Sequence, residues 1–179
     1  MRKVLFILGQ LNDSDVEWLS NAGTRRTVPA GEVLINEGVH LDTLYLILEG
    51  QMSVASGGFI FAKVASGDFL GEMSMLDSGR TSASVVCDIN STVLAVPKTL
   101  LDNRLSSDSG FAARFYKALA LFLADRMRNT ILHLGYGKLS SEQARDEDAR
   151  DLDELDVELL DNVHLAGARF DRILKKLMA

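Results

Sequence analysis

The residues best suited to chemistry lie in one glycine-rich stretch, residues 67–85. Gly71 frees the backbone there, and Glu72 follows it at the start of a short apolar turn. Backbone N–H groups exposed at such a turn can hold an anion, and Arg80, eight residues after Glu72, can neutralise its charge. The Glu72 carboxylate can accept hydrogen bonds from hydroxyl groups such as those of a ribose. A sugar acceptor, an amide cradle and a guanidinium group together predict a pocket for a nucleotide phosphate.

The remaining residue types favour no other chemistry. His40, His133 and His164 are spread along the chain, two of them in helical segments, so we expect no metal site of the cupin kind. No Ser-His-Asp arrangement, P-loop or paired-carboxylate motif stands out, and we expect no catalytic residues and no enzyme. Cys87 lies in an apolar run and is interpreted as a buried residue; one cysteine allows no internal disulfide, which is typical of a reducing compartment. The acidic run 140–161 lacks the glycine of a calcium loop and is interpreted as a solvated connector.

Length and composition predict one folded domain with an appendage. The chain has 179 residues, of which 47% are hydrophobic and 25% charged. Its net charge of −6 gives no positive field to attract nucleic acid or an anionic membrane, so neither is an expected partner. The apolar run at residues 4–8 has no signal-peptide cleavage region after it, and no run of about 18 apolar residues occurs. We therefore expect a cytoplasmic protein.

The first part of the chain, residues 1–23, contains one short predicted helix. Asp13 or Ser14 can cap this helix, which covers residues 13–22, and Gly23 can close it.

Residues 24–107 then show short strand-like runs separated by glycines, which is typical of a β-roll or jelly roll. The runs are 27–28, 33–35, 44–48, 52–54, 59–61, 84–86 and 93–96. Gly57-Gly58 predicts a hairpin turn, because both glycines can adopt a positive φ. The predicted fold class is mainly β with flanking helices.

The pattern becomes helical over residues 108–135, with two apolar stripes along the helix. One stripe comprises Phe111, Phe115, Ala118 and Phe122, and the other Tyr116, Leu119, Leu123, Met127, Ile131 and Leu134. If one stripe covers the barrel, the other can meet the same helix of a second subunit in a homodimer; alternatively, the helix is wedged into its own barrel. Residues 136–179 are interpreted as an acidic linker and an amphipathic C-terminal helix that must dock on a surface.

Residues 71–83 resemble the phosphate-binding cassette of the cyclic-nucleotide-binding domain family, which includes the bacterial catabolite activator and the regulatory subunit of protein kinase A. The similarity covers about residues 12–135. Its segments, in family order, are Pro29-Ala30-Gly31-Glu32, Asn36-Glu37-Gly38, Leu48-Glu49-Gly50, Gly67-Asp68-Phe69-Leu70-Gly71-Glu72 and Ala83-Ser84-Val85. The resemblance implies a β-roll that binds a cyclic nucleotide, followed by a long helix.

The resemblance also implies roles for residues of the cassette. Glu72 would accept the ribose 2′-hydroxyl, and an arginine would pair with the cyclic phosphate. Alongside Gly71, the backbone N–H groups that would line the phosphate belong to Met73, Ser74, Ser82 and Ala83.

The arginine of the cassette does not align directly with this chain. With Ala83 aligned without a gap, the family position falls on Thr81, and Arg80 lies one residue early. Neighbouring residues of an extended segment point to opposite faces. Either Gly79 lets the loop bring Arg80 into the pocket, or Thr81 offers a hydroxyl group in place of the charge and binding is weakened or lost.

The implied function is a cyclic-nucleotide-binding regulatory module, with cyclic AMP or cyclic GMP as its ligand and no other cofactor. The family often contacts the base from the long helix, where no assignment is made among Tyr116, Arg126, Arg128, Thr130 and His133. We expect the long helix to relay occupancy to a protein partner. A DNA-binding role is not expected. The residues after the long helix contain one predicted helix, and a helix-turn-helix module needs a second helix at recognition spacing. The alternative is a nucleotide-independent dimeric adaptor with a degenerate cassette.

Overall fold

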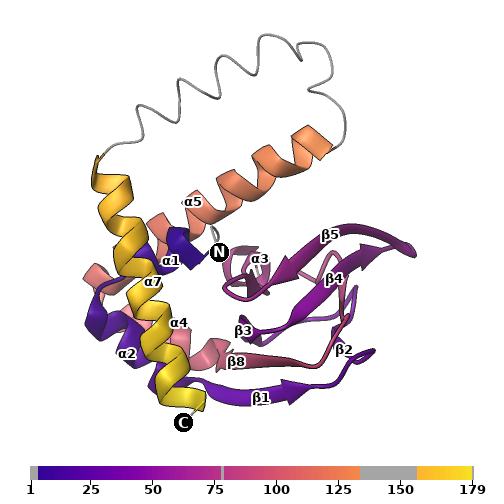
Figure 1. Cartoon of the computed structure of the whole chain (residues 1–179), viewed down its shortest axis with the longest axis horizontal. Coiled ribbons are helices and arrows are strands. Elements are labelled where there is room, and N and C mark those ends of the chain that lie inside the picture. The colour runs from indigo at the N-terminus through magenta and orange to yellow at the C-terminus, as the bar shows by residue number, and fades with distance from the viewer. Residues whose placement is uncertain (1–3, 78, 134–156, 179) are drawn as a thin grey trace.

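The computed structural model describes residues 4–77, 79–133 and 157–178. It contains two four-stranded antiparallel sheets, whose arrangement can be followed in Figure 1. The strands are β1 Thr24–Val28, β2 Val33–Ile35, β3 Thr43–Glu49, β4 Gln51–Ser56, β5 Phe59–Ala65, β6 Phe69–Leu70, β7 Ser84–Cys87 and β8 Ser91–Pro97. One sheet has the order β1-β8-β3-β6 and the other β2-β7-β4-β5. The predicted β-roll with flanking helices is confirmed.

Strand β3 shows how the roll is layered. Its residues are buried from Leu44 to Leu48, so both faces of the strand are covered. Leu44, Leu46 and Leu48 pack into the core that the helices share, whereas Tyr45 and Ile47 pack inside the roll. This alternation follows from the two-residue period of a strand, and it makes this sheet the wall between two cores.

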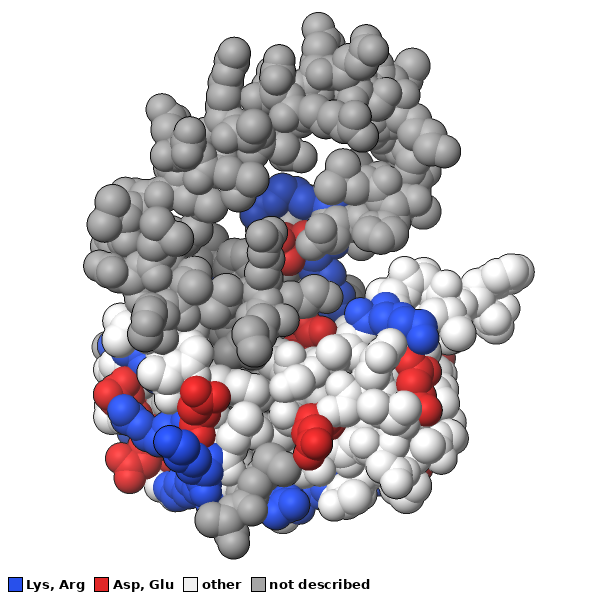
Figure 2. Space-filling view, viewed as in Figure 1, with Lys and Arg blue, Asp and Glu red and all other residues white. Residues whose placement is uncertain are grey.

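The hairpin between β4 and β5 turns at the predicted glycines. Gly57 and Gly58 have φ values of 58° and 86°, the positive values that a tight two-residue hairpin requires. Beyond the turn, Phe59, Ile60 and Phe61 are 78%, 62% and 58% exposed. The hairpin tip projects from the roll and carries no charged side chain on the face shown in Figure 2.

Six helices surround the roll in the described part of the chain. They are α1 Val4–Gln10, α2 Asp13–Ala22, α3 Met73–Asp77, α4 Lys98–Ser107, α5 Ser109–His133 and α7 Val157–Met178. The predicted helix 13–22 is present and Gly23 is its C-cap, but the N-cap is Asn12 rather than Asp13 or Ser14. The Asn12 side chain accepts from the N–H of Asp15, whose carboxylate accepts from the N–H of Asn12. Helices α1 and α4 were not predicted from the sequence.

Helix α5 buries one of its two predicted stripes. Phe111, Phe115, Ala118 and Phe122 are all buried in the core shared with the roll. In the second stripe Leu119 is also buried, while Tyr116 and Met127 are 46% and 63% exposed. Ile131 and Leu134 fall outside the side chains that the structure describes.

The predicted C-terminal helix, α7, docks on α1 and α2 (Figure 1). Ala166 and Ile173 are buried in the shared helical core. Around them, Arg169 Nε donates to Asp13 Oδ1 at 2.9 Å, and Arg169 Nη1 donates to the carbonyl oxygen of Leu8 at 3.0 Å. The predicted linker falls largely within residues 134–156, outside the described residues. No helix in the described part of the chain has the length and apolar character needed to cross a membrane.

Candidate functional site

The cassette, residues 71–83, connects β6 to β7 and contains the short helix α3. Its first residue, Gly71, has a φ of 85° and lies against the roll. A Cβ atom there would lie 2.6 Å from Leu41 Cδ2 and 2.8 Å from the carbonyl oxygen of Thr43. Backbone conformation and close approach therefore both require glycine, and together they set the direction in which Glu72 leaves the strand.

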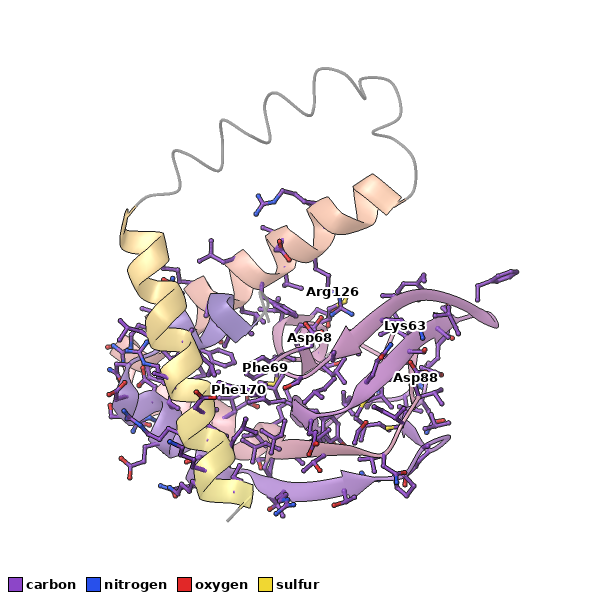
Figure 3. The ribbon with its side chains drawn as sticks, viewed as in Figure 1. Lys63, Asp68, Phe69, Asp88, Arg126 and Phe170 are labelled. Atoms are coloured by element: carbon purple, nitrogen blue, oxygen red, sulfur yellow. The ribbon has the colours of Figure 1, made fainter. Side chains whose placement is uncertain are left out.

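Glu72 is buried and pairs with an arginine from helix α5. Its side chain is 4% exposed, and Arg126 Nη1 donates a hydrogen bond to Glu72 Oε1. Burial raises the pKa of Glu72 above its usual value, against the opposing effect of the Arg126 charge. Arg126 extends from α5 towards the cassette (Figure 3) and stacks over the ring of Phe122, with its Cζ atom 6.0 Å from the ring centre. The contact joins two elements that are 54 residues apart in sequence.

A pocket with a cavity volume of about 60 Å³ lies between the cassette, the roll and α5 and opens to solvent. Its apolar walls come from Ile35, Leu41, Val54, Leu70 and Val85. Seven of the eight sequence-predicted ligand-binding residues line it: Gly71, Glu72, Met73, Ser74, Thr81, Ser82 and Ala83. A small apolar cleft with a few converging polar groups is typical of ligand sites.

Arg80, the eighth predicted residue, does not line this pocket. It pairs with His40 in an isolated antiparallel bridge, and its Nη1 donates to the carbonyl oxygen of Gly38 at 2.8 Å. Its neighbour Thr81 faces the pocket, and the Thr81 hydroxyl donates to the carbonyl oxygen of Asn36. Thr81 therefore lines the pocket at the position where the family has its arginine, as the ungapped alignment implies. Arg80, one residue earlier, bonds to the loop after β2 instead.

Ser74 links the cassette to the first residue of helix α4. It is buried, and its carbonyl oxygen accepts a 2.6 Å hydrogen bond from Lys98 Nζ at the start of α4. Ser74, Lys98, His40 and Asp102 also contribute to a second, more polar cavity behind the cassette. The cassette is thus held from α4 on one side and from α5 on the other.

The long helix provides one pocket residue, Arg126, that the sequence left unassigned. Among the other residues considered for base contacts, Tyr116 and Arg128 are exposed and do not line the pocket. The side chains of Thr130 and His133 are outside the described set. A signal for Arg126 exists in the helical period, because a charged residue four positions after Phe122 continues the buried stripe.

The described residues contain no cluster of three or more His, Cys, Asp or Glu side chains that could hold a metal ion. Cys87 is buried as predicted, and burial raises the pKa of its thiol above its usual value. The site described above can bind a ligand through hydrogen bonds, charge and apolar contact.

Comparison with known proteins places this site in a family. Residues 25–108 match the model of the cyclic nucleotide-binding domain. A cyclic nucleotide-binding domain from Methylobacillus flagellatus has a TM-score of 0.65 at 26% identity, over 72% of this chain and 79% of that chain. The catabolite activator protein of Thermus thermophilus has a TM-score of 0.57 at 28% identity, over 94% of this chain and 84% of that chain.

A curated relative, an NTE family protein of Mycobacterium tuberculosis, is 35% identical over 80 residues. The match covers 44% of this chain and 14% of that much longer protein. Residues 25–108, which match the family model, include most of the β-roll and its cassette, and we conclude that they form a cyclic nucleotide-binding domain.

Proposed function

We propose that this chain is a regulatory module that binds a cyclic nucleotide in the cassette pocket and transmits occupancy through α5 to a protein partner, without catalysis or DNA binding. The observation that carries the proposal is the contact between buried Glu72 of the cassette and Arg126 of α5. A ribose hydroxyl that donates to Glu72 changes the partners of this carboxylate. Binding therefore acts directly on a contact between the cassette and α5.

The route beyond α5 consists of packed helices. Helix α5 packs against α1, and α1 packs against α7. Arg169 of α7 donates to the carbonyl oxygen of Leu8 in α1, so a shift of α1 reaches α7 through side-chain and backbone contacts. Helix α7 also carries exposed Asp171 and Lys175, which are suited to a protein partner. Figure 2 shows acidic and basic side chains interleaved over this part of the surface.

Thermal unfolding with a panel of cyclic nucleotides tests the proposal. At a hundredfold excess over its dissociation constant, a ligand adds about 2.7 kcal/mol, which raises the midpoint by roughly 5–10 °C for a chain of this size. We expect this shift with cyclic AMP or cyclic GMP and not with linear 5′-AMP, the matched control. No shift with any cyclic mononucleotide or dinucleotide would contradict ligand binding and favour the nucleotide-independent adaptor.

The exposed stripe of α5 supports a homodimer as the form in which this module works. Tyr116 and Met127 are large, apolar and exposed on a helix whose opposite face is buried. Tyr116→Glu combined with Met127→Glu is expected to convert a dimer to a monomer, because two charges would be buried in the interface. Light scattering measures the mass, and a monomeric wild type would contradict the dimer.

A further inference from the structure

The cassette pocket contains one basic side chain among its described lining residues. That residue is Arg126, and the one acidic residue is Glu72. The other lining residues are apolar or hydroxyl-bearing. Among these lining residues, the cassette itself contributes no positively charged side chain that could pair with an anionic ligand. The positive charge at the pocket therefore comes from a residue of α5.

The structure gives the neighbouring basic residue, Arg80, a different role. Its guanidinium group donates to the carbonyl oxygen of Gly38, and its backbone pairs with His40. Thr81 reinforces this register, because its hydroxyl donates to the carbonyl oxygen of Asn36 and accepts from the N–H of Val39 at 3.1 Å. Bringing Arg80 into the pocket would break these contacts between the cassette and the loop after β2.

Arg126, by contrast, is already positioned at the pocket. The Phe122 ring lies beneath its guanidinium group, the Glu72 carboxylate bonds Nη1, and the side chain is 29% exposed. A guanidinium group presents five N–H donors in a planar fork, which can engage a carboxylate along one edge and a phosphate along another. These contacts reduce the conformational freedom that binding would otherwise remove.

We propose that Arg126 of α5, rather than Arg80 of the cassette, supplies the positive charge for the phosphate of the bound cyclic nucleotide. This inference rests on the proposed function. It places the ligand between two elements, with the sugar on Glu72 of the cassette and the phosphate charge on the long helix. Affinity then depends on the position of α5, and the position of α5 depends on the ligand.

Calorimetric titration with cyclic AMP and cyclic GMP tests this assignment. Arg126→Met is expected to weaken binding about ten- to a hundredfold, because a charge-assisted hydrogen bond to the phosphate is lost. Arg80→Met and Arg114→Met, the latter a matched arginine elsewhere on α5, are expected to change affinity less than about threefold. Arg126→Gln, which can still contact Glu72 but has no charge, is the second variant if the methionine variant does not fold.

A double-mutant cycle tests whether Arg126 contacts the ligand directly or acts by positioning Glu72. In a Glu72→Gln background the ion pair is already absent, and Arg126→Met is still expected to weaken binding at least about tenfold. If its effect disappears in that background, Arg126 acts through Glu72 and the proposal is overturned. Wild-type affinity in both Arg126 variants, or an equal loss in Arg80→Met, also overturns it while leaving the proposed function intact. If the wild type binds neither cyclic AMP nor cyclic GMP, the assignment of Arg126 and the proposed function are both contradicted.

Discussion

Among the residues that the structure describes, two arginine–carboxylate pairs connect α5 to other elements, and they differ in what surrounds them. Arg114 holds Asp15 through two hydrogen bonds, Nε to Oδ2 at 2.7 Å and Nη2 to Oδ1 at 3.0 Å. Arg126 holds Glu72 twelve residues further along the helix, a distance of about 18 Å for a 1.5 Å rise per residue. The first pair lies between helices, and the second lies at the edge of a pocket.

The difference lies in how completely each carboxylate is satisfied inside the protein. Asp15 also accepts from the backbone N–H of Asn12, and its hydrogen bond to Arg114 raises the pKa of the guanidinium group. Glu72 instead has a raised pKa, because burial outweighs the charge of its partner. We therefore expect the first pair to act as a structural clamp and the second to remain accessible to a ligand.

The largest expected effect is on the structural pair. Arg114→Met leaves Asp15, which is fully buried, without its cation and is expected to lower the free energy of unfolding by about 3 kcal/mol. Urea unfolding measures the loss, while the midpoint shift produced by cyclic nucleotide should be unchanged. A loss below about 1 kcal/mol would show that the helix cap alone satisfies Asp15.

Breaking the Arg126–Glu72 pair at the pocket should lower the free energy of unfolding by less, and a second substitution should offset part of that loss. Arg126→Met is expected to lower the free energy of unfolding by about 1–3 kcal/mol, since it leaves a buried carboxylate unpaired. Adding Glu72→Gln removes that charge, so the double variant should unfold within about 0.5 kcal/mol of Glu72→Gln alone. Costs that simply add would show that the two side chains do not stabilise each other.

The smallest effect is a difference in pH dependence between Glu72 and Asp13. Because the folded-state pKa of Glu72 is raised above 4.5, its charged form costs stability at neutral pH. The stability of wild type relative to Glu72→Gln should therefore rise as pH falls through the raised folded-state pKa towards 4.5.

Asp13 should behave in the opposite way. Hydrogen bonds from Arg169 and Arg172 lower its pKa, so its contribution is present above the unfolded pKa and is lost as pH falls through the folded value. Wild type relative to Asp13→Asn should thus lose stability below about pH 4, with no gain at higher pH. Unfolding curves across this range compare the two, and a parallel response of both variants would contradict the assignment of Glu72 as the desolvated group.

Local patterns predicted much of the roll. The alternation in β3 and the Gly57-Gly58 turn are short-range signals, and both are present in the structure. Strand β6, with two residues, is too short to produce a period, and α4 has no stripe because just Leu101 of its residues is buried. Asn12 was missed as a cap because Asp13 and Ser14 beside it are equally suitable residue types.

The chemical character of the cassette could be deduced from residue types, since the glycine at position 71, the carboxylate at Glu72 and the hydroxyl groups of Ser74 and Ser82 follow directly from the chain. Which basic residue faces the pocket could not. That choice depends on the register that turns Thr81 inward and Arg80 outward, and on the rotation of α5 that brings Arg126 to Glu72. Both are consequences of packing between segments distant in sequence, where a one-residue shift or a small helix rotation exchanges one side chain for another.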